Sequence, residues 1–395
     1  MQSAYIIIPT YNERENIQKV VPILLKIFDT IKKWDMQILV VDDSSPDGTA
    51  DVVRELAKKD TRVHLFLNKK KTGLGGAYLK GMDHAFYEKG ADVVFEFDAD
   101  LSHDPEKIPL FLDRIDEGYD MVLGSRYIPG GGIPEDWGLH RKFLSIVGNL
   151  TIQVVLTDFR IHDWTGGYRA ITRNVYDAVR EELQSERFSG YTFQIGFLTK
   201  AVKKGFKITE IPFKFVDRTI GESKLGMEYI KNTLLYIFKL RGKEVSESRA
   251  FKFVMTGGIG ALIQLLMLQV FRSLLPQFEW LFFSTLNVAN FLAIEVAIIS
   301  NFTLSNLWTF SDRQLMLRDI PKKFLQFNLT SGGSIVIQFL IVRKFEALLG
   351  VHPMFTIPVI GYPFDTGTLY VMIGILIGMF WNFFAYTKII WKKAK

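Results

Sequence analysis

The spacing of apolar positions changes along the chain. Up to about residue 250, short apolar runs alternate with segments in which apolar residues recur at helical spacing. Runs of the first kind predict buried strands, and segments of the second kind predict helices with one apolar face. Beyond residue 250 the apolar stretches are long enough to cross a membrane, which takes about 20 residues. The pattern therefore predicts an α/β domain followed by an all-α transmembrane domain.

Strands and helices alternate in the first half. The first helix is predicted from apolar positions between Ile17 and Phe28, with Asn12 and Glu15 as a capping box at its start. Because alternating strands and helices build βαβ units, the sequence predicts a Rossmann-like, mostly parallel sheet. Its strands are predicted at 5–8, 38–41, 63–67, 93–97 and 121–126, with a further strand just before Arg218.

Polar residues follow three of these strands, at Pro9–Glu13, Asp42–Ser45 and Asp98–Ser102. Ligands of parallel sheets bind at the carboxyl ends of the strands, so these segments are expected to converge on one edge. Asp98 and Asp100 can project the same way from a strand end because side chains alternate along a strand. Two such carboxylates can hold one divalent cation that keeps positions open for substrate phosphates. The alternative is an acidic turn, and the convergence favours the metal site.

Three neighbouring features have plainer interpretations. Gly73–Tyr78 departs from the G-x-G-x-x-G dinucleotide motif because Tyr78 takes the place of the last glycine, and it follows the third strand rather than the first. Lys69–Lys71 indicates a solvated loop, with contact to nucleotide phosphates as the alternative. His103 is either a metal ligand, a neighbour of the ligands or a solvent-facing side chain.

The charge of the chain fits a membrane better than nucleic acid. The net charge is +6, and the basic residues flank the apolar stretches, as in cytoplasmic loops of membrane proteins. We therefore expect a lipid bilayer, and no nucleic acid, as a partner. The chain has no cysteine, which excludes disulfides and thiolate metal sites. The apolar run Tyr5–Ile8 is too short for a signal peptide, so the first half is expected to stay in the cytoplasm.

Several segments, in the right order, resemble one family. They are Pro9–Asn16, Val41–Thr49, Asp98–His103, Gly124–Tyr127 and Asp217–Leu225. Together they resemble the dolichyl-phosphate (polyprenyl-phosphate) mannose synthases, which belong to the inverting GT-A glycosyltransferase family 2. The Gly221–Leu225 segment is the part that narrows the resemblance to polyprenyl-phosphate sugar transferases. The second half resembles the four-span GtrA-type membrane domain, with Asn301, Asn306 and Trp308–Phe310 as its most recognisable residues.

The resemblance implies a substrate pair, a metal and a set of binding residues. The donor would be GDP-mannose, the acceptor dolichyl or polyprenyl phosphate, and the metal Mg²⁺ or Mn²⁺. The nucleoside would lie against Pro9, Tyr11, Glu13, Val41 and Asp43, and the metal-bound diphosphate against Asp98, Ala99 and Asp100. Arg126, Arg218 and Lys224 would hold phosphates. Some archaeal relatives have glutamine at the position of Ser102, and a serine is not expected to coordinate the metal directly.

The chemistry of this reaction requires cations more than a base. The nucleophile is a phosphate monoester with a second pKa of about 6, so it is largely a dianion at neutral pH. We therefore expect Arg126, with Arg141, to place the acceptor, and Asp100 to act at the metal under the leaving diphosphate. In-line attack on the α-linked donor would invert it to a β-linked product.

The predicted domains are 1–225, the GT-A domain, 226–250, an amphipathic helix, and 251–395, the membrane domain. The helix has a basic face and is expected to lie in the membrane interface, with packing on the first domain as the alternative. Four spans are predicted near 253–275, 281–307, 323–343 and 367–390, with the catalytic domain and both termini in the cytoplasm. Two other functions remain open: transfer from another donor such as UDP-glucose, and a flippase or transporter whose first domain binds nucleotide-sugar.

Overall fold

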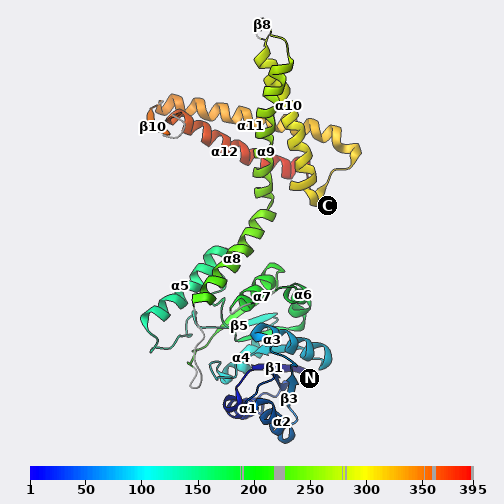
Figure 1. Ribbon diagram of the computed structural model, residues 1–395, viewed down its shortest axis with the longest axis vertical. Coiled ribbons are helices and arrows are strands. Elements are labelled where there is room, and N and C mark those ends of the chain that lie inside the picture. Colours follow the sequence, from blue (N-terminus) through cyan, green and yellow to red (C-terminus); the bar gives the residue numbers. More distant parts are fainter. Residues whose placement is uncertain are drawn as a thin grey trace. The chain divides into compact units, whose positions relative to one another are not determined.

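The computed structural model describes residues 1–186, 188, 191–217, 227–277, 279–280, 283–350, 352–357 and 362–392. The chain divides into two compact units, Met1–Arg241 and Gly242–Lys395 (Figure 1). The division falls inside helix α8 (Met227–Glu247), the segment predicted as an amphipathic helix.

A seven-stranded sheet forms the centre of the first unit. Its strands are β1 (Gln2–Thr10), β2 (Trp34–Asp42), β3 (Val63–Leu67), β4 (Val93–Glu96), β5 (Met121–Ser125), β6 (Arg169–Thr172) and β7 (Ile208–Pro212), in the order β3-β2-β1-β4-β6-β5-β7. The prediction of a mostly parallel sheet is confirmed, because among these strands β6 alone runs antiparallel to its neighbours. The strand expected just before Arg218 is wrong: the strand β7 lies earlier, and Lys214 makes an isolated bridge to Gly132.

Helices cover both faces of this sheet, and the alternation of side chains along β1 divides two cores. Tyr5 and Ile7 join the core that includes residues of α3, α6 and α7, whereas Ile6 and Ile8 join the core under α1, α2 and α4. The helices are α1 (Arg14–Phe28), α2 (Thr49–Lys59), α3 (Gly73–Asp83), α4 (Ile108–Asp116), α5 (Leu139–Leu156), α6 (Arg173–Gln184) and α7 (Thr192–Lys203).

The chain turns sharply where β1, β2 and β4 end. Asn12, Ser44 and Leu101 have positive φ angles of 63°, 58° and 60°. Such values are uncommon for residues other than glycine, and they cluster where a structure needs an unusual backbone path. The carboxyl edge of the sheet is therefore locally strained at each of the three segments that the sequence singled out.

The capping box predicted at Asn12 and Glu15 is wrong. Helix α1 begins at Arg14, and the backbone N–H groups at its start are satisfied from the segment that follows β2. The N–H of Asn12 donates to Ser45 Oγ at 3.0 Å, and the N–H of Arg14 donates to Asp47 Oδ2 at 3.1 Å. These contacts tie two loops of the carboxyl edge together.

The second unit is helical, with α9 (Arg249–Leu274), α10 (Thr285–Leu304), α11 (Ile320–Leu349) and α12 (Thr366–Ala385). Helix α9 packs with α10, and α11 packs with α12. Asn306 accepts hydrogen bonds from the indole N–H of Trp391 at 3.0 Å and from the N–H of Leu315 at 2.9 Å. Phe310 stacks on Trp391 with ring centroids 4.5 Å apart. Across the part of the chain that the structure describes, no helix has both the length and the apolar character needed to cross a membrane.

Candidate active site

The carboxyl edge of the sheet brings the donor-side candidates together. Pro9 is the register partner of Val41, and the N–H of Phe97 donates to the carbonyl of Ile7 in the neighbouring strand. Asp98, directly after Phe97, therefore lies at the same edge. Val41 is fully buried, so its side chain does not reach the accessible edge.

Three of the expected nucleoside residues, Pro9, Tyr11 and Glu13, are at least partly accessible. Tyr11 is exposed, and the ammonium group of Lys71 lies 3.5 Å above its ring. Glu13 is half-buried and accepts a hydrogen bond of 2.6 Å from the side chain of Asn16. An exposed aromatic ring can stack on a base, and a lysine beside it can contact a phosphate.

Asp43 is buried and already engaged. Its Oδ2 accepts from the N–H groups of Thr72 and Gly73 at 2.8 and 3.1 Å, and its Oδ1 accepts from the side-chain amide of Asn68 at 2.6 Å. Gly73 is the first residue of α3, so Asp43 places a carboxylate at the start of that helix, where negative charge is favourable. In this arrangement Asp43 organises the segment after β3.

Asp98 and Asp100 provide carboxylate oxygens on either side of the buried Ala99. Asp98 Oδ1 accepts from the hydroxyl of Tyr78 at 3.1 Å, and Asp100 Oδ1 accepts from the N–H of Ser102 at 3.1 Å. An ionised carboxylate has about four lone-pair positions and can therefore accept from several partners at once. Within the described residues, no group of three or more His, Asp and Glu side chains is arranged to hold a metal. Two carboxylates fit a hard cation that takes its remaining ligands from substrate phosphates.

His103 is buried, so the solvent-facing alternative is wrong. Its Nδ1 accepts from the backbone N–H of Asp98 at 3.1 Å, which places the ring proton on Nε2, 3.7 Å from Asp98 Oδ2. Burial lowers the pKa of His103, opposed by the nearby aspartates, and its ring stacks on Tyr168 at 4.8 Å. This tautomer has no free lone pair for a metal, so His103 orients Asp98 instead.

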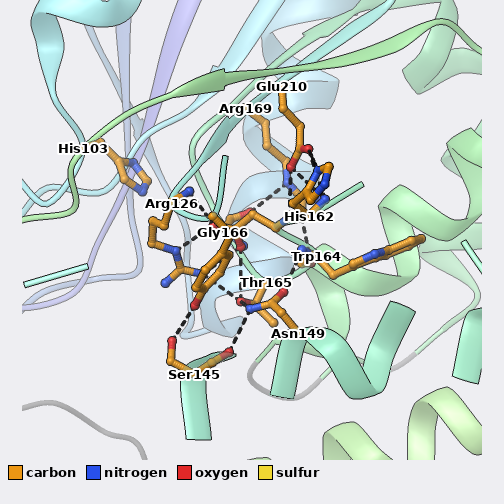
Figure 2. Close-up of polar contacts among 12 residues, drawn as sticks. His103, Arg126, Ser145, Asn149, His162, Trp164, Thr165, Gly166, Arg169 and Glu210 are labelled. Carbon is orange, nitrogen blue, oxygen red and sulfur yellow. Dashed lines mark hydrogen bonds and ion pairs between the residues drawn. The ribbon is translucent and has the colours of Figure 1, made fainter. Parts of the chain in front are cut away.

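Arg126 lies at the end of β5, and its guanidinium is paired with a carboxylate that the sequence did not single out. Nε donates to Asp163 Oδ2 and Nη2 donates to Asp163 Oδ1, both at 2.7 Å. Nη2 also donates to Thr165 Oγ1 at 2.8 Å (Figure 2). The side chain of Asp163 is fully buried and that of Arg126 is 10% exposed. The pair is therefore an internal ion pair rather than a surface one.

Arg141, near the start of α5, has a second carboxylate partner. Its Nη1 and Nη2 donate to Asp217 at 2.8 and 3.0 Å, and its guanidinium lies 3.7 Å from the ring centre of Trp137. Trp137 Nε1 donates to the same carboxylate at 2.7 Å. Both side chains of the ion pair are partly exposed, unlike the Arg126 pair.

A cavity of about 480 Å³ joins the two arginines to a mostly apolar space between α5 and α8. Two arginines, Arg126 and Arg141, supply the charge among the described residues that line it. The remaining lining is mainly small or apolar, and it includes Leu144, Val147, Gly148, Ile152, Ile230, Leu234 and Ile237. The space thus combines a cationic part with an apolar part, the composition that an amphiphile with an anionic head needs.

The expected phosphate-binding residues Arg218 and Lys224 lie outside the described residues. The sequence did not identify Asp163, Thr165, Asn149 or Glu210 as members of the site. The sequence offers one signal for Asp163 and Thr165, because residues 163–169, like residues 190–194, are typical of loops and helix starts facing a cleft. Which of these side chains reaches Arg126 depends on how the antiparallel strand β6 enters the sheet.

Comparison with known proteins gives two adjacent family matches. Residues 5–180 match "Glycosyl transferase family 2", and residues 233–391 match "GtrA/DPMS, transmembrane domain".

Three curated relatives are similar to the chain. A polyprenol monophosphomannose synthase of Mycolicibacterium smegmatis is 40% identical over 61% of this chain and 89% of its own length. A dolichol-phosphate mannosyltransferase of Pyrococcus furiosus is 32% identical over 93% of this chain and 97% of its own. An undecaprenyl-phosphate mannosyltransferase of Micrococcus luteus is 40% identical over 56% of this chain and 86% of its own. The family resemblance predicted from the sequence motifs is confirmed.

Proposed function

Because the chain belongs to glycosyl transferase family 2 and continues into a GtrA/DPMS transmembrane domain, we propose that it transfers mannose from GDP-mannose to dolichyl or polyprenyl phosphate. The products would be a β-linked mannosyl phospholipid and GDP. One relative that is similar over nearly the full chain is named a dolichol-phosphate mannosyltransferase, which supports this reaction class.

The observation that carries the proposal is the cavity between α5 and α8. A polyprenyl phosphate is a long apolar chain with one dianionic end, and the cavity offers apolar walls together with Arg126 and Arg141. Arginine matches the geometry of a phosphate through its planar fork of N–H donors. Ser145 of α5 also lines this space, and its hydroxyl lies 2.5 Å from that of Tyr127. We propose that these groups take the acceptor phosphate.

The donor would lie along the carboxyl edge of the sheet. In this proposal Pro9, Tyr11, Glu13 and Val41 surround the nucleoside, and Asp43 supports the adjoining loop rather than binding the base. Asp98 and Asp100 would hold Mg²⁺ or Mn²⁺, which when bound neutralises charge on the departing diphosphate. Arg218 and Lys224 are proposed as further phosphate ligands on sequence grounds alone.

This assignment needs no general base. The acceptor phosphate is ionised at neutral pH and attacks the anomeric carbon directly. Arg126 and Arg141 would fix its oxygen in line with the leaving diphosphate, so that the two reactants meet in a productive geometry. Attack from the face opposite the diphosphate inverts the α-linked donor.

The first unit also carries an apolar surface that suits a lipid bilayer. On α5, the exposed side chains of Leu139, Phe143, Ile146, Leu150 and Val154 recur at helical spacing. On α8, Leu235 and Phe238 are exposed among lysines. We propose that both helices lie in the membrane interface at the cytoplasmic face, and that the second unit contributes four spans.

A donor screen tests the proposal. The full-length protein, a divalent cation and a polyprenyl phosphate are combined with radiolabelled GDP-mannose or UDP-glucose, and lipid-linked sugar is counted. We expect transfer from GDP-mannose and at most a trace from UDP-glucose. Preferred transfer of glucose would overturn the donor assignment. Movement of lipid-linked sugar across vesicles without any transfer would favour the flippase instead.

A further inference from the structure

The buried carboxylate of Asp163 accepts hydrogen bonds beyond those of its ion pair with Arg126. Besides the two side-chain bonds from Arg126, it accepts from the backbone N–H of Arg126 at 3.2 Å and from the N–H of Gly166 at 2.9 Å. Burial opposes ionisation, but the charge and hydrogen bonds of Arg126 outweigh it and lower the pKa of Asp163. Asp163 therefore stays ionised and fixes both the backbone and the side chain of Arg126.

The segment that carries Asp163 is itself held from two sides (Figure 2). From β7, Glu210 accepts from the backbone N–H of Asp163 at 2.9 Å and from that of His162 at 3.0 Å. From α5, Asn149 accepts from the N–H of Trp164 at 2.9 Å. Asp163 consequently has little freedom to follow a displaced arginine.

This arrangement determines which edge of the guanidinium faces the cavity. Nε and Nη2 are engaged by Asp163 and Thr165, whereas Nη1 has no hydrogen-bond partner among the described residues. Arg126 lines the cavity, so this remaining edge is the part of the guanidinium that can meet a bound phosphate.

We propose that Asp163 is a positioning residue that aims Arg126 at the acceptor phosphate. This inference rests on the proposed function, because it takes the anion in the cavity to be the phosphate of the lipid acceptor. A buried ion pair is weak evidence for stability, since apolar replacements of similar size are often as stable. A role in aiming Arg126 explains why a carboxylate that also accepts from two backbone N–H groups stands at this position.

The role predicts a selective kinetic defect. In Asp163→Asn the side-chain volume is kept, but the charge and one acceptor oxygen are lost, and Arg126 can turn away. Hydrogen bonds to charged groups are worth enough that kcat/KM for the acceptor should fall by about 10- to 100-fold. The KM for the donor should stay within about twofold, because Asp163 has no part in the donor edge.

The test uses the full-length protein in detergent or proteoliposomes, with Asp163→Asn, Arg126→Gln and the double variant. The double variant removes both charges at once, so no charge remains buried without a partner. Thermal unfolding of each variant shows whether it is folded. We expect Asp163→Asn to lower acceptor kcat/KM in the wild-type background and to have no further effect in the Arg126→Gln background.

The other outcomes of this experiment would overturn either the role of Asp163 or the proposed function. A folded Asp163→Asn variant with wild-type acceptor kinetics overturns the inference, and so does an equal loss in both backgrounds. Parallel changes in donor and acceptor KM also overturn it, because they indicate a general structural role. Absence of mannose transfer by the wild-type protein would instead overturn the proposed function, which separates the two failures.

Discussion

The guanidinium of Arg141 lies against the carboxylate of Asp217, with Nη1–Oδ2 and Nη2–Oδ1 distances of 2.8 and 3.0 Å. If Arg141 takes the acceptor phosphate, the incoming phosphate must displace this carboxylate. Asp217→Asn should therefore lower the KM for the acceptor. The pair is partly exposed, and such pairs are weak, so the expected decrease is roughly 2- to 5-fold.

The matched control is Asp136→Asn, which removes one charge from an exposed residue beside Trp137. Steady-state kinetics with varied polyprenyl phosphate compare the two variants. An acceptor KM that rises in Asp217→Asn, or that falls equally in both variants, would contradict the displacement of Asp217 by the phosphate.

Filling the cavity should exclude the lipid chain. Gly148 of α5 lines the cavity, and a Cβ atom at this position would meet no atom within 4 Å. Replacing a helical glycine also favours the helix by up to about 1 kcal/mol, so Gly148→Phe should not weaken folding through the backbone. We expect a higher KM for long-chain polyprenyl phosphate and an unchanged KM for the donor.

Leu150→Phe is the control for this variant, because Leu150 lies on the exposed side of the same helix. A short-chain prenyl phosphate should be affected less than a long-chain one by Gly148→Phe. Equal effects of both acceptors, or of both substitutions, would mean that the apolar chain does not occupy this cavity.

The first effect of replacing Asp43 should be a lower free energy of unfolding. Asp43→Asn replaces one of the oxygens that accept four hydrogen bonds from Asn68, Thr72 and Gly73. The start of α3 then loses its anionic partner, at a cost of roughly 1–3 kcal/mol. Thermal unfolding of the full-length protein measures this loss. Asp51→Asn, at an exposed pair with Arg54, serves as the control. Equal unfolding temperatures for Asp43→Asn and the wild type would refute this role.

The pH dependence of transfer should follow protonation of the acceptor phosphate and not protonation of the Asp163–Arg126 pair. The pKa of Asp163 is lowered in the folded state, so the stability from its pair with Arg126 is present above the unfolded pKa of about 3.9 and is lost only as pH falls through the lower folded value. Between pH 8 and pH 5 the pair stays ionised. The acceptor phosphate instead gains a proton near pH 6.

We therefore expect kcat/KM for the acceptor to be level above about pH 7 and to fall towards tenfold per pH unit below about pH 6. Over the same pH range, titration of this pair should cause no change in the unfolding temperature. A level kinetic profile down to pH 5 would show that the dianion is not the nucleophile.

The sequence was sufficient for β1 to β5, most of which are buried on both faces and have continuous apolar runs, as in Ile38–Val41. It misplaced β7, the partly exposed parallel strand beside β5. It was insufficient for β6. Arg169–Thr172 is short and begins with a charged residue, and two glycines, Gly166 and Gly167, stand just before Tyr168, so it lacks the pattern of a buried strand. Arg169 is nevertheless fully buried, because its guanidinium donates to backbone carbonyls.

The same limit applies to the site. Asp98 and Asp100 are neighbours in the sequence, so their spacing already indicates a shared ligand. Asp163 and Arg126 are linked only through the fold, as are Asp217 and Arg141. A side chain's partner across such a separation depends on the paths of β5, β6 and β7, which local spacing does not determine. Local reasoning failed at Asn12 for the same reason, since its backbone partner is Ser45.

The most direct test of the central claim is mannose transfer by the full-length wild-type protein and by Asp100→Ala, assayed with GDP-mannose, polyprenyl phosphate and Mg²⁺ or Mn²⁺. We predict metal-dependent formation of a β-linked mannosyl phospholipid by the wild type, and loss of that product in Asp100→Ala and in excess EDTA. Full transfer by a folded Asp100→Ala variant, or by the wild type in excess EDTA, would contradict the claim that these carboxylates hold a metal at the leaving diphosphate.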